Sequence, residues 1–259
     1  MIASMASRII LLSLLLLVFI SCTSQTAKLL GGSDREIYDS ITSELAKKKT
    51  LYIFGGPRFS KVEDLLLTLQ VRYPYSEYTR ETYLINGDVS YRTKDYYDAI
   101  DDYEIFIEEQ PNHPKINYAK YMIIKSYSKL MTTMDKDISP SKKVIDLFNN
   151  LSVEMKNSEY FPEIKQIYKK ANILLLERTI YIANFYLKKE SYDSSLKRII
   201  ESEKSIKSLI ASNSEAQFIK LYCILMTDPN VDKRKLIDDY ATRFPKETSY
   251  IDDLYETIK

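Results

Sequence analysis

The chain has 259 residues, enough for one or two domains or for an array of repeats. With 45% hydrophobic residues, 28% charged residues and only 5 glycines, its composition is typical of a helical protein in water, which argues against a disordered or membrane-spanning chain. Lys and Arg number 37 against 36 Asp and Glu, so the basic excess of a nucleic-acid binder is missing and no nucleic-acid partner is expected.

The N-terminal segment predicts a secretory leader. Arg8 precedes a nearly continuous apolar run over residues 9–20, which is short for a membrane span but typical of a signal peptide. The following Phe19-Ile20-Ser21-Cys22 resembles a bacterial lipobox, with Phe19 where Leu is usual. We expect a signal peptide over residues 1–21, and diacylglycerol and N-acyl lipid on Cys22, with no other cofactor. An ordinary secretory leader with an incidental cysteine is the alternative.

Residues 22–34 are expected to be a tether that is acylated at Cys22. Two or three acyl chains on this cysteine would anchor the tether stably, because more than one chain is needed for firm membrane residence. Ser33 or Asp34 offers an N-cap for the first helix, in which residues 37, 38, 41 and 45 share an apolar face. A second helix runs from about residue 61 to Pro74. Residues 46–59 between the two helices are long for a repeat turn and partly apolar, so they either pack over the first helix or contact a partner.

The stretch from Tyr83 to Pro111 has the spacing of a tetratricopeptide repeat, a helix–turn–helix unit of about 34 residues. Small residues at Gly87 and Ala99 let two antiparallel helices approach closely, aromatic residues fill the space beside them, and Pro111 stops the second helix. One such unit cannot bury its own apolar face, so neighbouring units must stack on it.

The pattern continues to the C-terminus and predicts an all-α fold, a superhelical array of about five tetratricopeptide-type repeats over residues 35–259. The expected repeats cover residues 36–74, 80–111, 115–156, 165–208 and 214–245, and a capping helix follows at residues 250–258. Their signals include Asn112-His113-Pro114 before the third repeat, a long helix over residues 168–189, and the turn at Asp228-Pro229-Asn230.

The sequence has few residues that could form a catalytic site. His113 is the single histidine and stands at a helix start, where a polar turn residue is expected in place of a triad member or zinc ligand. Acidic pairs such as Asp101-Asp102 fit solvated helix faces. We therefore expect no enzyme and no metal site, and we expect Cys223, in an apolar helical run, to be a buried free thiol.

Several segments resemble the BamD family of outer-membrane assembly lipoproteins, which consist of five tetratricopeptide repeats. Besides the lipobox, they are Glu36-Ile37-Tyr38, Arg72-Tyr73-Pro74, Asn112-His113-Pro114-Lys115-Ile116-Asn117-Tyr118-Ala119, Tyr121-Met122 and Ala183-Asn184-Phe185-Tyr186. The sequence departs from the family at the 46–59 insertion, at Phe19, and at Lys156, where a proline would close the third repeat.

The resemblance implies a lipid-anchored protein on the periplasmic face of the outer membrane. Its implied partners are a BamA-type barrel subunit, other BAM lipoproteins and unfolded outer-membrane β-barrel precursors that carry a C-terminal signal. Arg198 matches a family arginine on the face assigned to the barrel subunit. The alternative is a lipid-anchored periplasmic scaffold that coordinates cell-wall or envelope proteins, although residues 23–34 are too short for the coiled-coil segment expected of it.

Repeat geometry indicates a peptide groove, because the first helix of each hairpin lines the inner face. The candidates are Tyr38, Thr42 and Leu45 in the first repeat, and Glu81, Leu84, Asp88 and Arg92 in the second. We expect Tyr38 and Leu84 to form an apolar floor for a terminal aromatic side chain, with Arg92 pairing with the terminal carboxylate. Alternatively, Glu81, Asp88 and Arg92 pair along their own helix without a ligand.

Overall fold

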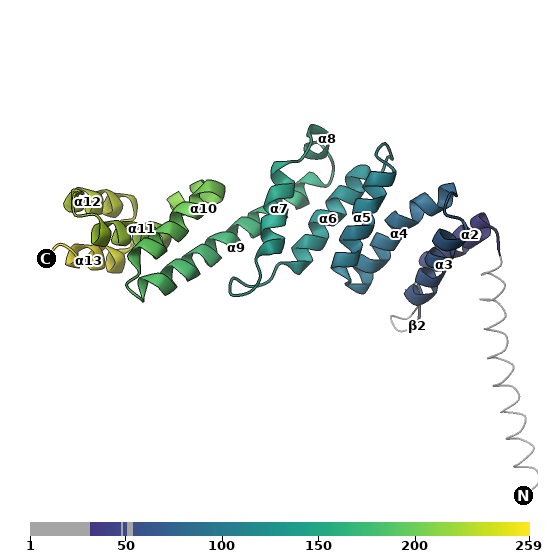
Figure 1. Ribbon diagram of the computed structural model, residues 1–259, viewed down its shortest axis with the longest axis horizontal. Coiled ribbons are helices and arrows are strands. Elements are labelled where there is room, and N and C mark those ends of the chain that lie inside the picture. Colours follow the sequence, from purple (N-terminus) through teal and green to yellow (C-terminus); the bar gives the residue numbers. More distant parts are fainter. Residues whose placement is uncertain (1–31, 48, 51–53) are drawn as a thin grey trace, which may run out of the picture. The chain divides into compact units, whose positions relative to one another are not determined.

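The computed structural model describes residues 32–47, 49–50 and 54–259, and it divides the chain into two compact units, Met1–Ile123 and Ile124–Lys259 (Figure 1). Most described residues lie in helices, and within each unit the helices pack against near neighbours in the chain. The predicted all-α array of helices is therefore confirmed. Among the described residues, no helix combines the length and hydropathy that crossing a bilayer requires.

Unit 1 contains the helices of the first two predicted repeats. They are α2 (Asp34–Leu45), α3 (Phe59–Arg72), α4 (Glu77–Thr93) and α5 (Tyr96–Glu109). Helix α2 packs on α3, both contact α4, and α4 packs on α5. The next helix, α6 (Ile116–Leu130), crosses the division between the two units.

A capping box starts α2. The Ser33 hydroxyl accepts a hydrogen bond from the Glu36 backbone N–H at 3.3 Å, and the Glu36 carboxylate accepts one from the Ser33 N–H at 2.9 Å. One face of α2 then buries Ile37 and Ile41 completely, in a cluster with Leu66 and its neighbours on α3. The predicted N-cap and apolar face are both present.

The segment between α2 and α3 contains a two-stranded antiparallel hairpin that the sequence did not predict. Strand β1 (Lys49–Thr50) pairs with β2 (Phe54–Gly55). Residues 48 and 51–53 lie outside the described residues, so both alternatives for the apolar part of this insertion stay open.

A buried carboxylate fastens the two ends of this insertion. Glu44, at the end of α2, is 1% exposed and accepts hydrogen bonds from Lys47 Nζ at 2.7 Å and from the Arg58 backbone N–H at 3.2 Å. Arg58 Nε and Lys61 Nζ lie 3.4 and 3.5 Å from its oxygens. Burial alone raises the pKa of Glu44, but the bonds from Lys47 and Arg58 outweigh it and lower the pKa to about 2. The ends of the insertion are thus held by buried charge pairing.

Helices α4 and α5 approach as closely as the repeat spacing predicts. A Cβ atom added at Gly87 would lie 2.7 Å from Cε1 of Tyr103, which is fully buried. Ala99 is also fully buried at this contact face. The lack of a side chain at Gly87 is therefore what allows the Tyr103 ring to pack against α4.

Unit 2 is also built from helices. Its further helices are α7 (Ser139–Asn149), α8 (Val153–Lys156), α9 (Phe161–Leu187), α10 (Tyr192–Ser212), α11 (Ser214–Thr227), α12 (Lys233–Arg243) and α13 (Thr248–Glu256). Helix α9 packs on α7, α10 and α11, and α11 also contacts α10, α12 and α13. The short α8 was not predicted, and α9 starts seven residues before the expected Tyr168, with Pro162 in its first turn, where its missing N–H costs nothing.

Small residues again mark a close helix approach in unit 2. Ser195 on α10 is fully buried and donates a 2.8 Å hydrogen bond to the backbone carbonyl of Ala183 on α9. Nearby, Cys223 on α11 is a buried free thiol, as the sequence predicted, and burial raises its pKa. Backbone dihedral angles break the helical pattern at Ile206, where α10 kinks.

Candidate functional site

A pocket of about 550 Å³ opens in unit 1 beside α2, α4 and the end of α5. Its lining mixes aromatic rings, acidic groups, a guanidinium and an amide. The residues are Tyr38, Glu77, Tyr78, Arg80, Glu81 and Gln110. Two of the seven residues predicted for a peptide groove, Tyr38 and Glu81, are among them.

Tyr38 and Glu81 are joined directly. The Tyr38 hydroxyl donates a 3.0 Å hydrogen bond to Glu81 Oε2, and its ring lies against that of Tyr78 with 4.9 Å between centroids. Burial and the Glu81 bond raise the pKa of Tyr38 to about 12, so this phenol stays a donor at physiological pH. The second oxygen of Glu81 lies 3.6 Å from His113 Nε2.

His113 links this pocket to the turn between α5 and α6. Its Nδ1 accepts a 3.1 Å hydrogen bond from the Lys115 backbone N–H, and its ring meets Phe106 edge-on at 5.0 Å. An imidazole that accepts at Nδ1 carries its proton at Nε2 when neutral, which directs that N–H toward Glu81. His113 is thus a polar turn residue, as predicted, and also supports one wall of the pocket.

The pocket offers unused hydrogen-bonding groups. Gln110 Nε2 is buried, and within the described part of the chain it has no hydrogen-bond partner. Arg80 is exposed at the rim. A donor amide, an accepting carboxylate and a guanidinium around two tyrosine rings suit the main-chain groups and charged end of a peptide.

The other predicted groove residues lie elsewhere. Leu84 is only 4% exposed and belongs to the core. Asp88 Oδ1 accepts hydrogen bonds from the hydroxyls of Tyr103 at 2.7 Å and Tyr118 at 2.6 Å, so α4, α5 and α6 meet at this carboxylate. Arg92 is exposed outside the pocket lining.

In the first repeat, Thr42 is exposed and donates to the backbone carbonyl of Asp39, while Leu45 packs against the α2–α3 cluster. Glu81 and Asp88 therefore bond to residues of other helices, which neither sequence-based alternative anticipated. Peptide binding by the predicted set stays a prediction. Cys22, the predicted lipid site, lies outside the described residues.

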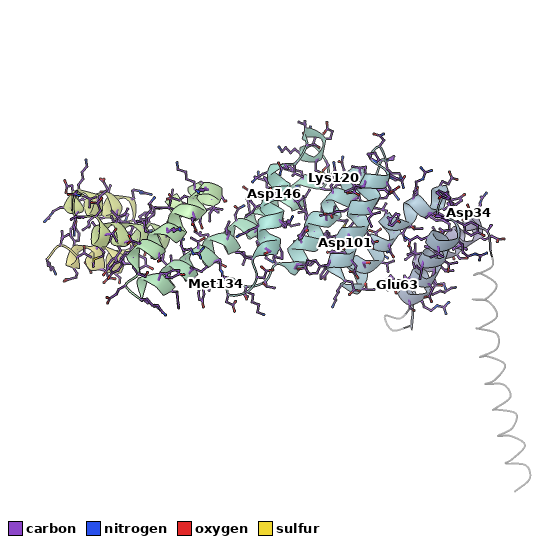
Figure 2. All side chains as sticks on the ribbon, in the orientation of Figure 1. Asp34, Glu63, Asp101, Lys120, Met134 and Asp146 are labelled. Atoms are coloured by element: carbon purple, nitrogen blue, oxygen red, sulfur yellow. The ribbon has the colours of Figure 1, made fainter. Side chains whose placement is uncertain are left out.

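An apolar groove of about 680 Å³ follows α9 in unit 2, and sequence reasoning missed it. Ile173, Tyr181 and Phe185 are each about half exposed along this groove, and Met134 borders it from the loop before α7, where Figure 2 labels it. Arg178 holds that loop by donating a 2.8 Å hydrogen bond to the Met134 carbonyl. Ile173, Tyr181 and Phe185 are eight and four residues apart on one long helix, and this spacing could have identified their shared apolar face from the sequence.

Arg198 lies in a third hollow, of about 440 Å³, lined from α7, α9 and α10. Its guanidinium is 3.6 Å from Glu201, and both side chains are about half exposed, so the pair remains accessible to a partner. Lys142 and Asp146 of α7 line the same hollow, and Figure 2 labels Asp146. Among residues 32–47, 49–50 and 54–259, no three His, Cys, Asp or Glu side chains cluster in a way that could hold a metal ion.

Paired helices packed in chain order, with open grooves along the first helices of the pairs, define a helical-repeat protein of the tetratricopeptide type. The sequence matches the YfiO family, described as outer membrane lipoprotein, over residues 33–248. The chain belongs to this family, which confirms the resemblance seen in its sequence.

Two curated relatives have the same name. "Outer membrane protein assembly factor BamD" of Caulobacter vibrioides is 21% identical over 243 residues, which cover 91% of this chain and 78% of the relative. The protein of that name from Rickettsia prowazekii is 24% identical over 151 residues, covering 58% of this chain and 60% of the relative.

Proposed function

We propose that the chain is a non-enzymatic, lipid-anchored subunit of the outer-membrane β-barrel assembly machinery. In this role it binds the periplasmic region of a BamA-type barrel subunit, joins other BAM lipoproteins, and receives unfolded β-barrel precursors. The observation that carries the proposal is the family match over residues 33–248, which includes helices of both units. The names of both relatives support the same role.

The anchor is the lipid on Cys22, at the periplasmic face of the outer membrane. Labelled palmitate should be incorporated into the protein in its native envelope, and Cys22→Ser should abolish the incorporation. Labelling that survives the substitution would show that another residue carries the lipid.

Precursor binding is proposed at the Tyr38–Glu81 pocket. An extended peptide has main-chain N–H groups that can donate to the Glu81 carboxylate, and carbonyl groups that could accept from Gln110 Nε2, which has no partner among the described residues. A terminal aromatic ring can pack on Tyr38 and Tyr78, and Arg80 can pair with the terminal carboxylate. The pocket thus supplies a partner for each feature of a barrel C-terminus.

A peptide titration tests this arrangement. Arg80→Ala should weaken binding of a barrel-derived C-terminal peptide about tenfold, the value of one charge-assisted contact. Arg92→Ala is the matched control, because Arg92 lies twelve residues further along the same helix, about 18 Å away. If only Arg92→Ala weakened binding, the carboxylate would bind where the sequence alone suggested, and unchanged affinity in both variants would exclude this face.

The barrel subunit is proposed to contact the Arg198 hollow. Arg198→Glu should reduce the amount of BamA that is recovered with the chain from solubilised envelopes, because it places three carboxylates, with Glu201 and Asp146, around one hollow. Lys207→Glu on the same helix is the control, since Lys207 is exposed and outside the hollow. Equal losses in both variants would point to net charge and would exclude a specific contact.

Depletion tests the role as a whole. Loss of the protein should lower the level of folded outer-membrane β-barrels, and unchanged porin levels after full depletion would contradict an assembly function. Recovery of cell-wall enzymes without BamA in the affinity experiment would instead favour the scaffold alternative.

A further inference from the structure

Helix α3 carries an apolar stripe that faces water. Leu67 is 60% exposed, Val71 is 70% exposed, and Tyr75, in the turn after the helix, is 96% exposed. Leu67 and Val71 are four residues apart and lie on one side of α3, and Tyr75 follows in the turn after the helix ends at Arg72. The opposite side of the same helix is fully committed to the core through Val62, Leu66 and Leu69. The stripe is therefore not needed for folding of unit 1.

The N-terminal tether joins the folded unit beside this stripe. The Tyr73 hydroxyl donates a 2.9 Å hydrogen bond to the Gly32 carbonyl, and the Ser76 hydroxyl donates a 2.8 Å bond to the Asp34 carboxylate. Tyr73 and Ser76 are two residues before and one residue after Tyr75. These bonds therefore fix Gly32 and Asp34 against the C-terminal end of α3. The chain therefore enters the folded unit close to Tyr75.

We propose that the stripe formed by Leu67, Val71 and Tyr75 is a membrane-contact surface that rests in the headgroup region of the bilayer to which the chain is anchored. The inference rests on the acylation of Cys22 in the proposed function. Gly32 lies ten residues after Cys22, and an extended chain spans at most about 3.5 Å per residue, so the join is within about 35 Å of the lipid surface.

The chemistry of the stripe fits a bilayer interface. Tyrosine is enriched at the level of the headgroups, and leucine and valine beside it can enter the acyl boundary. Arg72 is exposed next to Val71, where its guanidinium can reach lipid phosphate. The acidic Glu63 and Asp64 belong to the first half of α3, and Figure 2 shows Glu63 and Asp34 at opposite ends of the α2–α3 pair. The carboxylates of Asp34 and Glu77 do lie near Tyr75, so the apolar side chains and the anchor, and not the sign of the charge, favour contact with lipid.

Three side chains give weak affinity on their own, and the tether supplies the rest. A tethered surface binds intramolecularly, at an effective concentration set by the short linker. We therefore expect contact in the acylated protein and no stable vesicle binding by the stripe without acyl chains.

The chain has no tryptophan, so a single substitution creates a specific fluorescent reporter. The acylated full-length mature protein with Tyr75→Trp would be placed in vesicles of phosphatidylethanolamine and phosphatidylglycerol with brominated acyl chains. We expect at least twofold quenching relative to unbrominated vesicles, together with a blue shift. Tyr97→Trp on α5 is the matched control, since Tyr97 is 60% exposed in the same unit, and its emission should not change.

A second variant excludes an effect of the new indole itself. Adding Leu67→Ser and Val71→Ser to Tyr75→Trp should remove most of the quenching while the protein still floats with the vesicles through its anchor. Quenching that persists in this variant would overturn the proposal, as would an unquenched Tyr75→Trp reporter in protein that floats. Failure to float would instead contradict acylation itself.

Two further outcomes would assign the stripe to another occupant. Shielding of the reporter only in native envelopes, and not in pure lipid, would show that a protein covers the stripe. Shielding that grows with protein concentration in solution would show a second copy of this chain. Either result would overturn the assignment to lipid.

Discussion

The contact between Gly87 and Tyr103 makes a quantitative prediction about Gly87→Ala. The new methyl carbon would lie 2.7 Å from Tyr103 Cε1, whereas carbon atoms pack at about 3.5–4.0 Å, so the ring or the helix must shift by about 1 Å. Overpacking of this kind costs about 1–3 kcal/mol. A ring shift also disturbs the 2.7 Å bond from the Tyr103 hydroxyl to Asp88, which contributes about 1–1.5 kcal/mol.

One effect opposes this cost, because alanine stabilises a helix interior by about 1 kcal/mol relative to glycine. The net expectation is a loss of about 2 kcal/mol in the local unfolding free energy of the α4–α5 hairpin. Native-state hydrogen exchange of α4 and α5 amides measures this quantity without assuming that both units unfold together. Tyr103→Leu in the Gly87→Ala background should recover part of the loss, which a double-mutant cycle would register as coupling. Equal or higher protection in Gly87→Ala, or zero coupling, would refute the steric argument.

Three further predictions concern buried ionisable groups. Glu44→Gln should destabilise unit 1 by about 3 kcal/mol at pH 7, because the low pKa of Glu44 means that its ionised form stabilises the fold. This stabilisation is complete above about pH 4.5 and is lost as pH falls toward 2. The difference in urea unfolding free energy between the two proteins should therefore be smaller at pH 3 than at pH 7. Asp102, which the sequence placed on a solvated helix face, is only 9% exposed, and burial raises its pKa to about 6. Its protonated form therefore stabilises the fold at low pH, and this stabilisation is lost as pH rises through 6. Lowering the pH from 7 to 5 should protect α5 amides more in the unmutated protein than in Asp102→Asn, and an equal gain in both would contradict the assignment. Cys223 should react with a thiol reagent only upon opening of unit 2, so fast labelling under native conditions would contradict its burial.

The parts of the fold that follow from local spacing were predictable. Gly87, Ala99 and the aromatic residues between α4 and α5 predict a close hairpin because their spacing alone places them on facing sides of two helices. The short α8 and the β1–β2 hairpin escaped prediction, since each has too few residues to show a period. The start of α9 at Phe161 was also missed, and Pro162 occupies its first turn, where proline is tolerated.

The candidate site was predictable only in part. The spacing of residues along a helix predicts which of them share a face, but it does not predict which other helix packs on that face. Tyr38 and Glu81 were expected on one surface, and they are hydrogen-bonded there. Asp88 was expected on the same surface, but the hydroxyls of Tyr103 and Tyr118 reach it from two other helices. Such contacts depend on how separate helices are stacked, which repeat spacing does not specify.

The Glu44 clamp has a consequence for how this region can change. Because the ends of residues 46–57 are fixed to each other by buried charges, added length between them costs only loop entropy, about 0.6 kcal/mol for each doubling. Relatives can therefore gain or lose residues there without disturbing the α2–α3 core. The same tolerance makes the β1–β2 connection a practical place to insert an epitope or a fluorophore-binding peptide for following the protein in living cells.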